Sequence, residues 1–297
     1  MRRRSLALVA LASLSAPALS AACPPLGLDA EGLAALRARD FVIEDADRRE
    51  AMAVQWLDCL ASPDPAWRDG GAYEALSAWL RGDALRPEAR QALMERLIES
   101  LRTPAPDPDG VRAPFEALVL AEIARTDRIA PWLDAAQRQR LVDAAAGYLA
   151  GVRDWRGFEP GIGWRHGVAH GADFAMQLAL NPALDRAQLD RLLEAVAAQV
   201  APQGAPPYTH GEAERLVRPV LFALQRGQHD EAAWLAWLAT VVAAAPPADA
   251  PTEATMLARR HNLRVFLFVL HGTLATSGSP ALEARVPAVA DVLRRMP

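Results

Sequence analysis

The chain has 297 residues, of which 52% are hydrophobic, and its 36 acidic and 32 basic residues leave a formal charge of -4 at pH 7. Nucleic-acid binding needs a clustered basic face, so this balance favours no nucleic-acid partner. Residues 1–22 contain three arginines, an apolar run from Leu6 to Leu14 and a stretch of small residues. That order predicts a signal peptide and a periplasmic or secreted protein.

The two cysteines leave three alternatives open. Cys23 and Cys59 form a disulfide if export takes them to an oxidising compartment. Small residues before Cys23 also fit a lipid anchor on Cys23, which would make the protein an anchored lipoprotein. The third alternative is two free thiols. After the signal peptide, no segment has the roughly 18 to 20 apolar residues of a transmembrane helix, so we expect none.

Apolar residues recur at three- and four-residue steps along the chain, which predicts an all-α protein of about twelve helices. The expected helices are 29–40, 46–61, 66–82, 87–102, 110–127, 134–152, 164–180, 185–200, 211–227, 230–245, 252–274 and 279–295. Short links rich in proline separate them, as in antiparallel helix pairs. We therefore expect residues 23–297 to form one helical-repeat domain, an irregular α-solenoid of the HEAT or armadillo type. A closed α/α ring is the structural alternative.

Four polar residues share one face of the expected helix 164–180. His166, His170, Asp173 and Gln177 fall within a stripe about 60° wide at 3.6 residues per turn. The other residues from 167 to 180 are apolar or glycine, which predicts burial on most sides. The stripe then forms a hydrogen-bonded structural network, lines a binding pocket, or takes part in metal or acid–base catalysis.

The metal interpretation rests on His166 and His170, whose four-residue spacing suits two ligands of one divalent transition metal. Asp173 lies too far along the helix from His166 for all three side chains to reach one ion easily. We expect it instead to contact His170 and to fix the orientation of that imidazole. Further ligands would come from Asp154, Glu159, His210 or Glu212. Otherwise we expect no cofactor.

The connection before this helix, "RDWRGFEPGIGWR", is rich in glycine and charge, and such loops often carry binding residues. Asp154 and Glu159 are candidate binding residues, with pairing to the nearby arginines as the plainer explanation. Trp155 and Trp164 flank the glycines and are expected to line a pocket. A second polar cluster contains Tyr208, His210, Glu212, Glu214, Arg215 and Arg218. Its acids also suit the first turn of a helix.

Several segments resemble, in the same order, a bacterial family known as domain of unknown function 2785. These are "WLDCLASPDPAWRDGGAYEALSAWL", "FEALVLAEIARTD", "RDWRGFEPGIGWRHGVAHGADFAMQLALNP" and "GEAERLV", within residues 50–245. The resemblance implies a helical-repeat fold and brings no activity. It also implies that Trp164, His166, His170, Gly171 and Asp173 belong to the family signature. The signal peptide and Arg165 depart from the family's pattern.

These observations predict an exported protein that binds a peptide, a protein or a small polar ligand at a pocket around residues 153–177. The candidate binding residues are Asp154, Trp155, Glu159, Trp164, His166, His170, Asp173 and Gln177. The alternative is a metal-assisted hydrolase in which His166 and His170 hold the ion and Asp173 orients His170.

Overall fold

The computed structural model describes residues 23–25, 27–244, 246 and 253–296 of the chain. The expected signal peptide, 1–22, lies outside the described residues. The elements are α1 (Ala30–Arg37), α2 (Ala46–Cys59), α3 (Pro65–Trp67), the π-helix η1 (Arg68–Tyr73), α4 (Glu74–Arg81), α5 (Pro87–Arg102), α6 (Arg112–Ile129), α7 (Ala135–Gly151), β1 (Phe158–Glu159), β2 (Gly163–Trp164), α8 (Gly167–Ala179), α9 (Arg186–Val200), α10 (Glu212–Gln225), α11 (Glu231–Ala243), α12 (Ala254–Ala275), α13 (Pro280–Glu283) and α14 (Val286–Arg295). The all-α prediction is confirmed.

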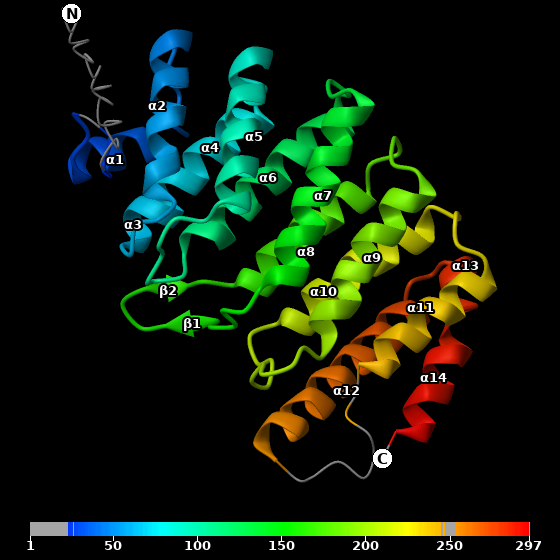
Figure 1. The fold of residues 1–297 in the computed structure, drawn as a ribbon. Coiled ribbons are helices and arrows are strands. Elements are labelled where there is room, and N and C mark those ends of the chain that lie inside the picture. The colour runs from blue at the N-terminus through cyan, green and yellow to red at the C-terminus, as the bar shows by residue number, and fades with distance from the viewer. Residues whose placement is uncertain (1–22, 26, 245, 247–252, 297) are drawn as a thin grey trace, which may run out of the picture.

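The helices are arranged in two layers that follow the chain from one end of the molecule to the other (Figure 1). One layer contains α4, α6, α8, α10 and α12, each of which contacts the next. The other contains α5, α7, α9 and α11, also in successive contact. Helix α8 lies near the middle, with α6 and α10 on its two sides and α7 and α9 across the layers.

Aspartates fix where several helices begin. The side chain of Asp134 accepts a hydrogen bond from the Gln137 backbone, and the Gln137 side chain accepts one from the backbone of Asp134. Asp185 and Gln188 repeat this reciprocal capping box at the start of α9. Each cap satisfies backbone N–H groups that the first helical turn leaves unpaired.

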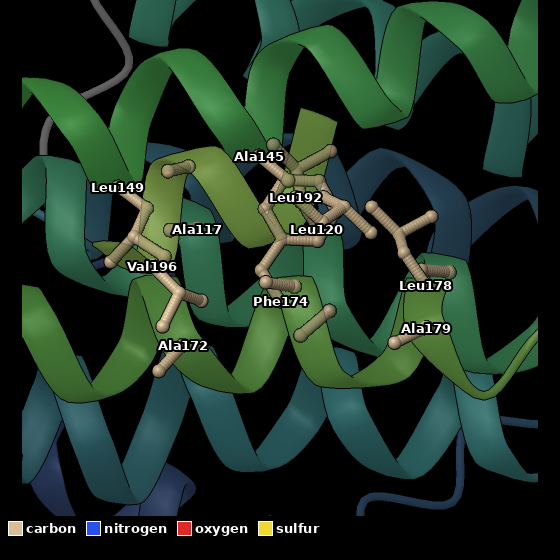
Figure 2. Packing of buried hydrophobic residues seen from close by; sticks show 14 of the residues in the cluster. Ala117, Leu120, Ala145, Leu149, Ala172, Phe174, Leu178, Ala179, Leu192 and Val196 are labelled. Atoms are coloured by element: carbon tan, nitrogen blue, oxygen red, sulfur yellow. The ribbon is translucent and has the colours of Figure 1, made fainter. Parts of the chain in front are cut away.

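The core between the layers is apolar and rich in leucine and alanine, and Figure 2 shows part of it. Phe174 of α8 is fully buried and lies among apolar side chains of α6, α7 and α9. A Cβ on Gly171 would come within 3.1 Å of side-chain atoms of both Tyr148 and Leu149. The glycine therefore allows α7 and α8 to pack closely. This packing fixes the position of α8 and of its polar residues His170, Asp173 and Gln177.

Two of the expected helices are interrupted. The expected helix 66–82 is divided into α3, η1 and α4. The π-helix passes against the ring of Trp56, and a Cβ on Gly71 would stand 2.8 Å from that ring. The expected helix 279–295 is divided into α13 and α14.

Helix 164–180 begins later than predicted. Trp164 belongs to strand β2, which pairs antiparallel with β1 through Phe158–Trp164 and Glu159–Gly163. The prediction that the chain is helical from residue 164 is therefore wrong. Each strand has only two residues, which is too short to produce the alternating pattern that identifies strands.

Cys23 and Cys59 form a disulfide, with their Cα atoms 4.9 Å apart. The bridge attaches the segment before α1 to the end of α2. A lipid on the Cys23 sulfur and this bridge exclude each other, and the structure contains the bridge. Within the described part of the chain, no helix combines the length and apolarity needed to cross a bilayer.

Candidate functional site

The β1–β2 hairpin ends at a histidine with an unusual backbone. His166 immediately precedes α8 and has φ 55° and ψ 35°, the left-handed region. A residue with a side chain occupies this region at a cost of about 1 kcal/mol or more, and such positions cluster at functional sites. The prediction that His166 lies within the helix is therefore wrong, because the helix starts at Gly167.

Two buried arginines hold the hairpin against the helical layers. Arg68 of η1 is fully buried, and it donates a hydrogen bond of 2.8 Å to the Ile162 carbonyl. Its guanidinium carbon also lies 4.8 Å from the centre of the Phe115 ring. Arg165 is 2% exposed, donates to the Asp109 carbonyl and pairs with Glu159 at 2.7 Å. The hairpin is thus fixed at both its turn and its end.

An aromatic cluster lies on this fixed hairpin. The Trp164 indole is tilted over the His166 ring with centroids 4.2 Å apart. Phe158 and His210 each form an edge-to-face pair with it, at 5.0 Å and 5.9 Å between centroids. Trp164 is nevertheless 42% exposed. The three neighbouring rings therefore cover only part of the indole, and the rest of it is open to solvent.

His170 lies directly behind His166. The two rings are stacked, with centroids 5.7 Å apart and planes at 22°. Nδ1 of His170 lies 3.2 Å from the Pro114 carbonyl, and Phe115 meets the ring edge to face at 5.1 Å. Burial and nearby positive charge lower the pKa of His170 to about 3 and that of His166 to about 4. Both imidazoles are therefore neutral at neutral pH.

Asp173 is bound by two arginines of α10. Arg215 donates a hydrogen bond to its Oδ2, and a nitrogen of Arg218 lies 3.7 Å from Oδ1. Burial raises the pKa of Asp173, while the two guanidinium groups oppose that rise. The expectation that Asp173 orients His170 is wrong, because His170 contacts the Pro114 carbonyl and Asp173 contacts the arginines.

The polar edge continues along α8 and α6. Arg128 of α6 donates a hydrogen bond of 3.3 Å to the Gln177 side chain. Glu122, also on α6, accepts a hydrogen bond of 2.7 Å from Arg81 of α4, and its charge raises the pKa of Asp173. We call the side chains of Trp164, His166, His170, Asp173, Arg215 and Arg218 the α8 edge cluster.

The remaining predicted residues lie away from this cluster. Asp154 forms an ion pair of 2.5 Å with Arg156, and Trp155 contacts the Gln199 side chain. Both line a cavity of about 390 Å³ together with Arg153, Arg156 and Pro206. Glu159 pairs with Arg165. The residues predicted to line one pocket therefore do not all lie together, because the connection after α7 turns Asp154 and Trp155 toward α9 and the following loop.

Residues 208–218 are expected to form a second polar cluster, from which His210 and Glu212 are also candidate metal ligands. In the structure His210 contacts Trp164, and Arg215 contacts Asp173. A Cβ on Gly157 would stand 2.3 Å from the His210 ring, so a glycine is required there. No local spacing signals these contacts, since they join residues more than 40 positions apart. Among the described residues, no group of three histidine, cysteine or carboxylate side chains is placed to hold a metal ion.

The chain matches the family described as protein of unknown function, DUF2785, over residues 97–271. It therefore belongs to this family, as the resemblance of its motifs predicted. The matched region includes the hairpin and helices α6 to α10 that build the cluster. No curated protein and no solved structure matches the chain. The solenoid of the HEAT or armadillo type stays a prediction.

Proposed function

We propose that this protein binds a small polar ligand or a peptide on the α8 edge cluster, with the exposed part of the Trp164 indole as the main contact. The observation that carries this proposal is the fixed, exposed indole beside neutral imidazoles and charged groups. Aromatic rings supply a large contact area at low entropy cost, and polar groups beside them set orientation.

The way the hairpin is anchored supports a binding role. Burying arginine side chains is costly, and Arg68 and Arg165 are both almost completely buried. His166 adds a left-handed backbone. These features hold a tryptophan at the surface, where it contributes less to the hydrophobic core than a buried one.

The test is a binding screen by isothermal titration calorimetry with hexoses, uronic acids, amino acids and tripeptides. We expect at least one class to bind, and Trp164→Ala to weaken it about tenfold or more, the loss of about 1.4 kcal/mol of contact. Trp164→Phe should restore part of the affinity. Phe268→Ala, which removes an aromatic ring that is 59% exposed on α12, is the matched control. Binding that Trp164→Ala leaves unchanged would refute the proposal.

We also propose that the protein works outside the cytoplasm, in the periplasm or after secretion. The disulfide between Cys23 and Cys59 supports this location, since such bridges persist in oxidising compartments. The test is thiol labelling of the protein from cell fractions. Two blocked cysteines in the periplasmic or secreted fraction are expected, whereas reactive thiols in a cytoplasmic fraction would contradict it.

A metal-assisted hydrolase is the second candidate. It is favoured by the stacked pair of His166 and His170, whose low pKa values keep both imidazoles in the neutral form that binds metals. Elemental analysis of the purified protein tests it. One bound transition metal that is lost in both His166→Ala and His170→Ala would support this candidate, and metal-free protein would exclude it.

A further inference from the structure

A cavity of about 560 Å³ lies between α2, α5 and α6, and it shares no residue with the α8 edge cluster. Its size falls within the range of about 300–1,000 Å³ that is typical of small-molecule sites. The lining side chains are Val54, Leu57 and Asp58 of α2, Glu95, Arg96, Leu97, Glu99 and Ser100 of α5, and Arg112 and Glu116 of α6. The cavity therefore combines apolar side chains with several charged groups.

Most of the charged groups in this cavity already have partners. Glu95 and Glu99 each form an ion pair with an arginine outside the cavity, at 2.5 Å and 2.8 Å. Glu116 is buried, and its carboxylate accepts a hydrogen bond of 2.7 Å from the Ser100 hydroxyl. The same carboxylate lies 3.6 Å from a nitrogen of Arg112. These three carboxylates are therefore not available to a ligand without breaking a contact.

Asp58 and Arg96 are the two charged groups of the cavity that remain. Among the described residues, neither side chain forms a hydrogen bond or comes within 4.0 Å of an opposite charge. Burial raises the pKa of Asp58, and the positive charges of Arg112 and Arg96 oppose that rise. The cavity thus presents one free carboxylate from α2 and one free guanidinium from α5.

The position of Asp58 makes its charge unfavourable while the cavity is empty. The residue is half-buried and directly precedes Cys59, the last residue of α2. The negative end of the helix dipole disfavours a carboxylate there and favours a cation. An ammonium group bound to Asp58 would therefore be attracted by the carboxylate and by the helix end. Groups that are kept at a cost to stability are common at binding sites.

We infer that this cavity binds a small linear molecule whose ammonium group pairs with Asp58 and whose carboxylate pairs with Arg96. The two protein charges come from different helices, so the ligand carries its charges at its two ends. Val54, Leu57 and Leu97 supply apolar surface for the carbon chain that joins them. A guanidinium group suits the carboxylate end because it can donate two parallel hydrogen bonds. The class of ligand is a linear ω-amino acid.

Calorimetry of the purified protein tests this inference with 3-aminopropanoate, 4-aminobutyrate and 6-aminohexanoate. Each is compared with the amine and with the carboxylate of the same chain length, which keep only one of the two charges. We expect at least one amino acid to bind at least tenfold more tightly than both of its matched probes. The chain length that binds best measures the separation of the two charges. These linear probes are not part of the screen for the α8 edge cluster, so the two sites are tested separately.

Variants test the two charged contacts. Asp58→Asn and Arg96→Gln should each weaken binding of the amino acid about tenfold or more. Arg191→Gln should leave it unchanged, because Arg191 is an arginine of α9 with a side chain that is 49% exposed and lies outside the cavity.

The melting temperature without ligand separates binding from folding. Asp58→Asn should melt at the same or a higher temperature than the wild type, since it removes a charge that no side chain compensates. A clearly lower melting temperature would show that Asp58 stabilises the fold and would contradict the inference. The inference is also overturned if no amino acid binds more tightly than its matched probes, or if Asp58→Asn binds it like the wild type.

Discussion

His166 and His170 lie ring against ring, 5.7 Å between centroids, although only His170 belongs to α8. The left-handed backbone of His166 turns the chain from the hairpin into the helix and places its imidazole between Trp164 and His170. The hairpin and the helix are thus joined by three successive rings. The strength of this junction can be measured.

Replacing His166 tests the backbone strain at the junction. Both His166→Ala and His166→Gly remove the ring, but glycine adopts a positive φ without steric cost. We therefore expect His166→Gly to be about 1 kcal/mol more stable than His166→Ala. Urea unfolding measures the difference. If alanine is as stable as glycine, the left-handed conformation is not maintained in solution.

The pH dependence of stability tests the burial of His170. Its pKa falls from 6.5 to about 3 on folding, mainly through burial and then through the nearby charges of His166, Arg215 and Arg68. Between these pH values the unfolded chain binds a proton that the native protein does not bind, so the contribution of His170 to the free energy of unfolding decreases as pH falls.

His170→Gln removes this titration. The stability difference between the wild type and His170→Gln should therefore change in favour of the variant as pH falls below about 6.5. Denaturant unfolding at several pH values provides the comparison. If the free energies of unfolding of the two proteins change in parallel with pH, His170 is not kept neutral by folding.

The contribution of Glu116 to stability should depend on pH in the opposite direction to that of His170. Burial raises its pKa from 4.5 to about 7, with Ser100 and Arg112 opposing the rise. Its stabilising contribution is complete below about pH 4.5 and is lost as pH rises through about 7. Glu116→Gln should therefore gain stability relative to the wild type as pH rises over this range. A constant difference, measured by the same unfolding method, would contradict the raised pKa.

Removing Arg68 tests the anchor of the hairpin. Arg68→Met removes the hydrogen bond to the Ile162 carbonyl and leaves Asp69 without its ion-pair partner. We expect a loss of about 3 kcal/mol in the free energy of unfolding and greater exposure of Trp164 to a fluorescence quencher. Arg140→Met, which breaks an exposed pair with Glu95, should cost less than about 0.5 kcal/mol. Equal effects of the two substitutions would show that Arg68 is no anchor.

The sequence predicts the helices well because their signals are local. Apolar spacing identifies α5, α7 and α9 almost to the residue, and Asp134 and Asp185 mark two of the starts. The hairpin depends instead on Arg68, which is 94 residues from its hydrogen-bond partner Ile162. Strands of two residues are too short to show an alternating pattern, and contacts with distant residues leave no signal in the local sequence. The hairpin could therefore not be predicted from the sequence.

The candidate site was predictable in part for the same reason. The four-residue spacing of His166 and His170 predicts neighbouring rings, and the rings are neighbours in space. The partners of Asp173 come from α10, 42 residues later in the chain. Local spacing therefore assigns Asp173 to His170, whereas the packing of α8 against α10 gives it to Arg215 and Arg218.

The most direct test of the central claim is NMR of the tryptophan indole N–H groups during titration with a ligand found in the calorimetric screen. Trp164→Phe assigns the resonance of Trp164, and the fully buried Trp56 is the internal reference. We predict that the Trp164 resonance shifts with ligand concentration while that of Trp56 stays unchanged. A ligand that binds without moving the Trp164 resonance would contradict the account.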